Sequence, residues 1–219
     1  MTPLTYWFDP ISPYAYLAFE RLPQALEGCS YVVEYRPILL AGLLKHWGQL
    51  GPAEIAPKRD WTYRQVLWLA RQQGTELALP AAHPFNPLPL LRLLIACGRG
   101  GRPNRLQCET VLRHVWQGGA AADDAQRLAA LTARLQPPRD PQGDAVKQQL
   151  RDETAAALRH GVFGVPTVEL APGRAGAAPR LFWGLDALPM LRAALDGDPW
   201  FDGPPWDAPP IAAPGHVRR

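Results

Sequence analysis

A serine–proline pair stands where the sequence changes from a strand pattern to a helix pattern. Ser12 and Pro13 follow an aromatic run at 4–8 and precede a helical periodicity over 14–27. Serine is a favoured N-cap and proline a favoured first helical residue, so one role of the pair is simply to start a helix. The free N–H groups and partial positive charge of a helix N-terminus also attract anions. A thiolate held there would be stabilised, with the Ser12 hydroxyl donating a hydrogen bond to its sulfur.

The chain supplies no cysteine of its own at this helix start. Its three cysteines, Cys29, Cys97 and Cys108, are widely spaced and form no C-x-x-C motif. This spacing argues against a disulfide scaffold, a zinc site and dithiol redox chemistry. The five histidines are dispersed and form no H-E-x-x-H or comparable cluster. We therefore expect no metal site, and a thiol would have to arrive with a ligand.

A second motif, GVFGVPT at 161–167, joins the end of a helix to the start of a strand. Glycine commonly ends helices, and a trans bond before proline is the ordinary form. If the Val165–Pro166 bond were cis, the N–H and C=O of Val165 would turn outward beside Ser12. They could then pair with a peptide-like ligand in the manner of an added strand. The residues alone leave both isomers open.

The surrounding elements predict a small sheet interrupted by helices. Strand patterns occur at 4–8, 31–36, 165–170 and 180–183, and a last helical pattern at 186–195. The segment between the second and third strands has no strand pattern and shows helical patterns at 61–73, 89–97, 105–117, 125–135 and 145–159. A strand, a helix and a further strand indicate a right-handed βαβ unit with parallel strands.

The predicted fold class is therefore α/β, with a βαβ…ββα domain split by an all-helical insertion. The sheet domain would comprise 1–38 and 160–198, and the insertion 39–159. Six prolines fall in the last 21 residues, so we expect an extended tail at 199–219.

Composition excludes several other classes of protein. The chain has 219 residues, a net charge of +3 and no concentrated Lys/Arg stripe, so nucleic acid is not an expected partner. No apolar run approaches the roughly 20 residues that span a bilayer. The N-terminus lacks the basic and apolar regions of a signal peptide. We expect a cytoplasmic protein with a sizeable core and no membrane partner.

Four segments occur in the same order as in a known family. They are FDPISPYAYLA at 8–18, RPILLAGLLKHWG at 36–48, GVFGVPT at 161–167 and LFWGLDAL at 181–188. Together they resemble the 2-hydroxychromene-2-carboxylate isomerases and the related kappa-class glutathione transferases, over residues 4 to 196. The resemblance implies a thioredoxin-like domain with a helical insertion. Wider thioredoxin relatives carry C-x-x-C where this chain has residues 12–15, SPYA, and this replacement removes disulfide exchange.

The resemblance also implies a ligand and its contacts. Glutathione would be the thiol ligand, and Ser12 its catalytic contact. A cis peptide would precede Pro166, and Val165 would pair with the cysteinyl part of glutathione. Asp186 matches an acidic residue that receives the γ-glutamyl amino group, and Lys58 a lysine near the glycyl carboxylate. The implied glutathione-binding residues are Ser12, Gln49, Lys58, Val165, Pro166, Leu185 and Asp186.

Two positions depart from the family pattern. Relatives commonly have Gly-Asn before a Pro-Pro pair where this chain has Gln49 in GQLGP, and Asp-Arg-Leu where it has Ala187 after Asp186. Asn86 is kept in the segment HPFNP.

The activity implied by the resemblance is glutathione-dependent conversion of 2-hydroxychromene-2-carboxylate to trans-o-hydroxybenzylidenepyruvate. The aromatic carboxylate substrate needs a cationic partner. The candidate substrate-binding residues are Arg36, Lys45, Asn86 and Arg92. Since several relatives are dimeric, a homodimer is a further expectation. The alternatives are a transferase that conjugates electrophiles and a noncatalytic module that binds glutathione or another ligand.

Overall fold

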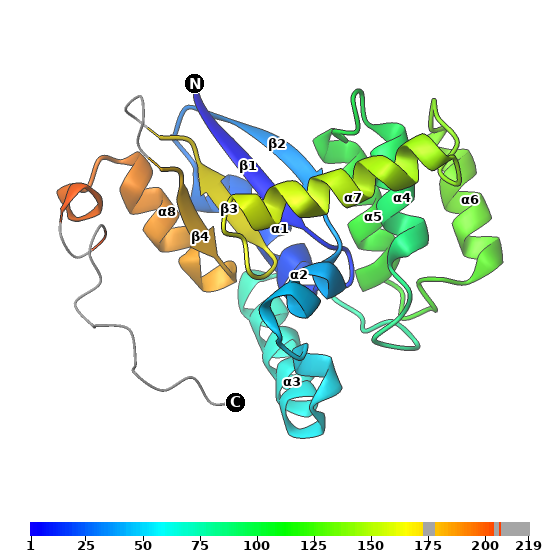
Figure 1. Ribbon diagram of the computed structural model, residues 1–219. Helices are drawn as coiled ribbons and strands as arrows, with labels where there is room; N and C mark the ends of the chain where they lie inside the picture. Colours follow the sequence, from blue (N-terminus) through cyan, green and yellow to red (C-terminus); the bar gives the residue numbers. More distant parts are fainter. Residues whose placement is uncertain (173–177, 204–205, 207–219) are drawn as a thin grey trace.

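The computed structural model describes residues 1–172, 178–203 and 206 and centres on a four-stranded mixed sheet (Figure 1). The strands are β1 (Thr2–Phe8), β2 (Tyr31–Pro37), β3 (Thr167–Leu170) and β4 (Arg180–Trp183), in the spatial order β2-β1-β3-β4. β1 runs parallel to β2 and antiparallel to β3, and β3 runs antiparallel to β4. This confirms the βαβ…ββα arrangement expected from the sequence.

Eight α-helices accompany these strands in the described residues. They are α1 (Pro13–Ala25), α2 (Leu40–Trp47), α3 (Ala56–Gln73), α4 (Leu88–Cys97), α5 (Arg105–Trp116), α6 (Ala125–Leu135), α7 (Asp144–Arg159) and α8 (Leu188–Leu195). The described residues also contain three short 3-10 helices, which are η1 (Pro52–Glu54), η2 (Leu185–Ala187) and η3 (Pro199–Asp202). The sequence patterns missed α2 and placed the start of α3 five residues late, because Pro57 opens α3 at a position permitted only in a first turn.

The helices α2 to α7 all lie between β2 and β3 in the sequence, and this fully described stretch contains no sheet strand. We propose to regard 39–159 as the insertion and 1–38 with 160–198 as the sheet domain. The two parts share one core, since α1 packs on both α3 and α5.

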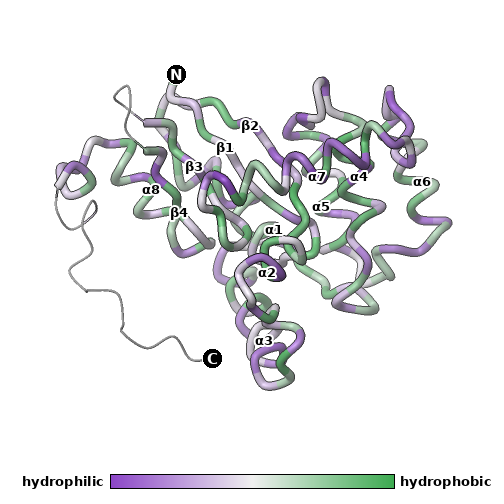
Figure 2. The backbone as a smooth tube through the Cα atoms, viewed as in Figure 1, coloured by the Kyte–Doolittle hydropathy of each residue, from purple (hydrophilic) through white to green (hydrophobic). Residues whose placement is uncertain are grey.

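Alternating residues of β1 enter two different cores. Leu4, Tyr6 and Phe8 lie in the larger core with α1, α5 and α8, whereas Trp7 lies in a smaller core beneath α7. This follows from the period of two in a strand, which sends successive side chains to opposite faces. Figure 1 shows α7 crossing one face of the sheet and α1 behind the other. In Figure 2, hydrophobic and hydrophilic segments alternate along α7, as expected for a helix with one face on the sheet.

The start of the C-terminal segment is folded, so the expected extended tail is wrong for Pro199–Gly203. Phe201 in η3 is buried and its ring lies 5.8 Å from that of Phe182 on β4. Trp206 stacks on the same Phe182 ring with a centroid distance of 5.5 Å. Aromatic burial against β4 thus outweighs the extended preference of the prolines. Residues 204–205 and 207–219 of that expected tail lie outside the described residues.

No helix within the described ranges is both long enough and apolar enough to cross a membrane.

Candidate active site

Ser12 caps the helix that the sequence predicted it would start. Its backbone is extended, with φ −88° and ψ 118°, and its Oγ accepts a hydrogen bond of 3.2 Å from the N–H of Ala15. The Ser12 Oγ also lies 3.5 Å from the carbonyl oxygen of Val165, toward which its hydroxyl can donate. A contact of this length is weak. The Ser12 O–H can therefore turn to a stronger acceptor without losing its cap bond.

The first turn of α1 has little free hydrogen-bonding capacity apart from one backbone donor. Pro13 has no N–H, and the N–H groups of Ala15 and Tyr16 already bond to Ser12. The N–H of Tyr14 has no backbone acceptor in the described part of the chain. A free N–H at a helix N-terminus, beside a hydroxyl that can donate, suits a small anion.

The Val165–Pro166 peptide bond lies across from Ser12 and is cis, as the resemblance implied. Val165 is largely buried, and β3 begins two residues later, at Thr167. A Cβ atom at Gly164 would lie 2.5 Å from the indole nitrogen of Trp183, so any other residue would require that ring to move. The Val165 carbonyl is thereby brought to Ser12 from a position 153 residues along the chain.

Asp186 also lies at this end of the molecule. It sits in η2, which directly follows β4 and contacts α1, and its side chain is exposed. Burial raises the pKa of the Tyr14 phenol, and the nearby charge of Asp186 adds to this rise. The contact of η2 with α1 places Asp186 on an element that packs against this helix. Leu185, also in η2, is half-buried and packs against the larger core.

Three predicted residues lie on the exposed segment from α2 to α3. Lys45 is in the last turn of α2, Gln49 follows that helix, and Lys58 is in the first turn of α3. All three side chains are exposed, and within the described residues none is hydrogen-bonded to the Ser12 region. The structure therefore places Ser12 against Val165, next to Pro166, and puts Leu185 and Asp186 on η2, which packs on the same helix α1. Among the described residues, no hydrogen bond links Lys45, Gln49 or Lys58 to Ser12.

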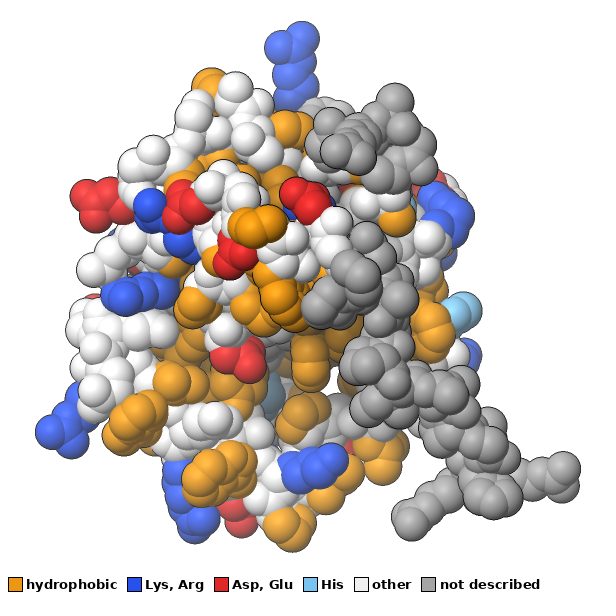
Figure 3. Space-filling model, turned by 90° about the vertical axis from the view of Figure 1, so that its left-hand side faces the viewer, with side chains coloured by type: hydrophobic (Ala, Val, Ile, Leu, Met, Phe, Trp, Pro, Cys, Tyr) orange, Lys and Arg blue, Asp and Glu red, His pale blue; other side chains and the backbone are white. Residues whose placement is uncertain are grey.

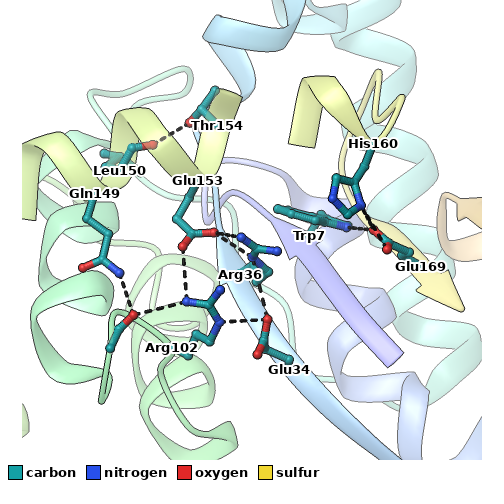
Figure 4. Close-up of polar contacts among 11 residues, drawn as sticks. Trp7, Glu34, Arg36, Arg102, Gln149, Leu150, Glu153, Thr154, His160 and Glu169 are labelled. Atoms are coloured by element: carbon teal, nitrogen blue, oxygen red, sulfur yellow. Dashed lines mark hydrogen bonds and ion pairs between the residues drawn. The ribbon is translucent and has the colours of Figure 1, made fainter. Parts of the chain in front are cut away.

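Arg36 is withdrawn as a substrate-binding candidate, because its charge is already paired. Its Nη2 lies 2.5 Å from Oε2 of the buried Glu153 on α7, and its guanidinium lies over the Trp7 ring at 4.2 Å (Figure 4). This network ties α7 to the sheet. Trp7 itself donates to Glu169, which also contacts His160. A substrate carboxylate would have to displace Glu153 to reach Arg36.

The two remaining substrate-binding candidates lie on or just before α4. The Asn86 side-chain oxygen accepts from the N–H of Leu88 at 3.1 Å, a local turn at the start of this helix. Arg92 donates to Gln142 and lines a mostly apolar groove of about 410 Å³ between α2, α4 and α7. The Asn86 side chain thus has a structural role at the start of α4 that does not involve a substrate.

The face of the molecule that carries α8 and β4 has a hollow bordered by hydrophobic side chains (Figure 3). Two exposed aromatic residues extend the apolar surface next to Val165. These residues are Phe163, two positions before Val165, and Trp183 on β4, and their ring centroids lie 5.0 Å apart. An aromatic substrate would find apolar contacts on such a surface.

The chain's own thiols lie away from Ser12. Cys97 and Cys108 are buried, and burial raises the pKa of Cys97 to about 11 and that of Cys108 as well. Cys29 lies beyond the C-terminal end of α1, with its Sγ 3.9 Å from Asp196. Among the described residues, no three His, Cys, Asp or Glu side chains lie grouped so that they could hold a metal ion. A nucleophilic thiolate at Ser12 thus has no source in these cysteines.

Sequence reasoning missed the buried Asp9, which connects the Ser12 loop to α2. One carboxylate oxygen accepts from the N–H of Ile11 at 3.0 Å, and the other from the N–H of Leu40 at 2.9 Å. The Ser12 N–H donates to the Asp9 carbonyl at 3.0 Å. The aspartate–serine spacing in FDPIS is compatible with such a turn, but nothing in the sequence points to the partner in α2.

Asp9 gives a testable pH dependence of stability. Burial raises the pKa of its carboxyl from 3.8 to about 7, against the opposing effect of its two N–H partners. Between about pH 4 and about pH 7 the folded protein therefore holds a proton on Asp9 that the unfolded chain has lost. The contribution of Asp9 to the free energy of unfolding falls as the pH rises through that range. At about 1.36 kcal/mol per pKa unit, the fall is at most about 4 kcal/mol.

Urea unfolding across this pH range should show a steeper loss for the wild type than for Asp9→Asn, which cannot ionise. Equal pH slopes for the two proteins would contradict the assignment to Asp9.

Comparison with known proteins agrees with the resemblance seen in the sequence. The chain is 27% identical over 201 residues to 2-hydroxychromene-2-carboxylate isomerase of Pseudomonas sp. (strain C18), covering 89% of this chain and 90% of that protein. It is also 27% identical over 215 residues to glutathione S-transferase kappa 1 of Rattus norvegicus, covering 90% and 92%. A solved structure of 2-hydroxychromene-2-carboxylate isomerase is similar with a TM-score of 0.72 at 25% identity, covering 89% and 94%.

These similarities confirm the expected kinship with both groups of relatives, one named as isomerases and the other as transferases. Residues 4–196 match the family described as DSBA-like thioredoxin domain, the same range that the four sequence segments suggested. The four-stranded sheet and the helices around it agree with that match. The chain belongs to the DSBA-like thioredoxin domain family.

Proposed function

We propose that this protein is a glutathione-dependent isomerase that interconverts 2-hydroxychromene-2-carboxylate and trans-o-hydroxybenzylidenepyruvate. The observation that carries the proposal is the position of Ser12, whose hydroxyl lies at a helix N-terminus and faces the Val165 carbonyl at 3.5 Å. The relatives named as isomerases support the choice of reaction. We also propose a cytoplasmic location and a homodimer.

The side chains at this end of the sheet suit glutathione as a thiol ligand. Ser12 donates a hydrogen bond to the sulfur, and the free N–H of Tyr14 adds a second donor for negative charge. The backbone of Val165, next to Pro166, pairs with the cysteinyl part. Asp186 receives the γ-glutamyl ammonium, with Leu185 beside it in η2. Lys58 and Gln49 on the exposed α2–α3 segment are the proposed partners of the glycyl end, which would have to extend from Ser12 to reach them.

When bound, glutathione would supply a thiolate for addition to the conjugated double bond of the ring-opened substrate; rotation about the resulting single bond, followed by elimination of the same thiolate, would restore the double bond in the trans form and regenerate glutathione. The role of the protein is to keep the sulfur ionised and oriented toward the substrate. Ser12 and the N-terminus of α1 do this with dipoles fixed before the reaction, so little reorganisation is needed. The rings of Phe163 and Trp183 offer apolar contacts to the aromatic substrate. Lys45 and Arg92 remain the candidates for its carboxylate.

A second candidate is a kappa-like transferase that conjugates electrophiles, favoured by the equal identity to the rat kappa enzyme. Both reactions need the same thiolate, so only the products separate them. Incubation with 2-hydroxychromene-2-carboxylate and glutathione should yield the trans isomer with total thiol unchanged. Loss of thiol with accumulation of a stable conjugate would replace the isomerase by the transferase. Absence of turnover and of glutathione binding would leave a noncatalytic module.

A further inference from the structure

His83, in the loop between α3 and α4, makes a direct hydrogen bond to the loop that precedes Ser12. Its Nε2 lies 2.8 Å from the carbonyl oxygen of Ile11. Its other ring nitrogen, Nδ1, lies 2.8 Å from the hydroxyl of Tyr63 on α3. The insertion thus reaches the residue immediately before Ser12 through a chain of two side chains.

The partners define the protonation of this ring. A carbonyl oxygen can only accept, so Nε2 carries a hydrogen, and in the neutral ring Nδ1 is then the acceptor. The Tyr63 hydroxyl donates to Nδ1, although the His83 carbonyl oxygen lies 3.1 Å from the same hydroxyl. Burial lowers the pKa of His83, which keeps the ring neutral near pH 7. With both nitrogens engaged, His83 has no free lone pair to accept a proton from a ligand.

The bond to Ile11 fixes the plane of the peptide unit that leads into Ser12. The C=O of Ile11 and the N–H of Ser12 belong to one planar peptide group. The C=O accepts from His83, while the N–H donates to the Asp9 carbonyl at 3.0 Å. Both edges of this plane are therefore held. The preceding carbonyl, of Pro10, accepts from the buried Trp116 indole at 2.9 Å.

We propose that His83, oriented by Tyr63, is a positioning residue that holds the Ile11–Ser12 peptide and so aims the Ser12 hydroxyl at a bound thiol. This inference rests on the proposed function, because the thiol belongs to glutathione. Its consequence is physical: if the peptide plane turns, the Ser12 donor and the first turn of α1 no longer point to the same place. The ionised thiol then loses stabilisation.

The test uses His83→Ala, His83→Gln and Tyr63→Phe, with His114→Ala as the matched control. Glutamine keeps an N–H donor near the position of Nε2. His114 is also half-buried and also contacts a backbone carbonyl through Nε2, that of Ala122 at 2.9 Å, so its partner lies outside residues 8–16. The pKa of bound glutathione is read from the ultraviolet absorbance of its thiolate. Amide hydrogen exchange of residues 8–16 is measured on the free protein.

His83→Ala should raise the pKa of the bound thiol by about one unit, a tenfold change in ionisation, as expected for loss of one aimed hydrogen bond. It should also speed exchange in residues 8–16. His83→Gln should restore most of both effects, Tyr63→Phe should give a smaller shift, and His114→Ala should change neither.

A wild-type thiol pKa in His83→Ala, with unchanged exchange, would overturn the positioning role. If the wild type binds no glutathione, the proposed function fails. In that case the exchange data still show whether His83 orders the loop before Ser12. Unchanged exchange in His83→Ala would reject this ordering role as well.

Discussion

Replacing Ser12 with alanine is expected to lower turnover by about 10²–10³-fold, the usual effect of removing one aimed donor from a site that stabilises negative charge. The protein should remain folded. Loss of the bond between Ser12 Oγ and the Ala15 N–H costs about 0.5–2 kcal/mol, the range for an N-cap. Steady-state kinetics and urea unfolding measure the two effects separately.

Asn104→Ala is the control for this experiment. Asn104 caps α5, accepting from the N–H of Gln107 at 2.9 Å, and its side chain has no contact with Ser12 or Val165 among the hydrogen bonds of the described residues. We expect a similar loss of stability and wild-type turnover. Two results would show that Ser12 has no special role with the thiol. One is wild-type turnover in Ser12→Ala, and the other is an equally large loss of turnover in Asn104→Ala.

The second large effect concerns stability. Glu153→Ala is expected to reduce the free energy of unfolding by about 3–5 kcal/mol, because it leaves the Arg36 charge buried without its nearest partner. The pair qualifies as buried, since the side chains of Arg36 and Glu153 are only 14% and 7% exposed. Arg102 also loses its contact at 3.3 Å with Glu153 (Figure 4). Urea unfolding monitored by tryptophan fluorescence measures the change.

Two comparisons show whether burial is the cause. Glu109→Ala removes a more exposed ion pair with Arg113 and should cost only about 0–1 kcal/mol. The double variant Arg36→Met with Glu153→Met should recover much of the stability lost in Glu153→Ala, since no unpaired charge remains. A Glu153→Ala protein as stable as the Glu109→Ala protein would refute the structural role of the pair.

The sheet could be read from the sequence because each of its elements has a local signal. The β-branched and aromatic run at 31–36 became β2, and the Ser12–Pro13 pair starts α1 as expected. Where two local signals compete, the prediction from the sequence was wrong. Pro199 and its neighbours indicated an extended tail, yet Phe201 is buried against β4, which composition alone does not reveal.

The parts of the site that could not be foreseen depend on contacts distant in sequence. Arg36 looked available for a substrate because its partner, Glu153, lies 117 residues away. His83 looked like one of several dispersed histidines, although it bonds to Ile11 from 72 residues away. A periodicity shows which face of an element is buried, but not which residue of another element meets it.

Calorimetric titration with glutathione near pH 7, in buffers of different ionisation enthalpy, measures the protons released on binding. A free thiol has a pKa near 8.5 and is mostly protonated at this pH. If Ser12 and the N-terminus of α1 hold the sulfur as a thiolate, binding should release most of one proton per glutathione. Binding without proton release, or no binding, would contradict the central claim that this site activates a glutathione thiol.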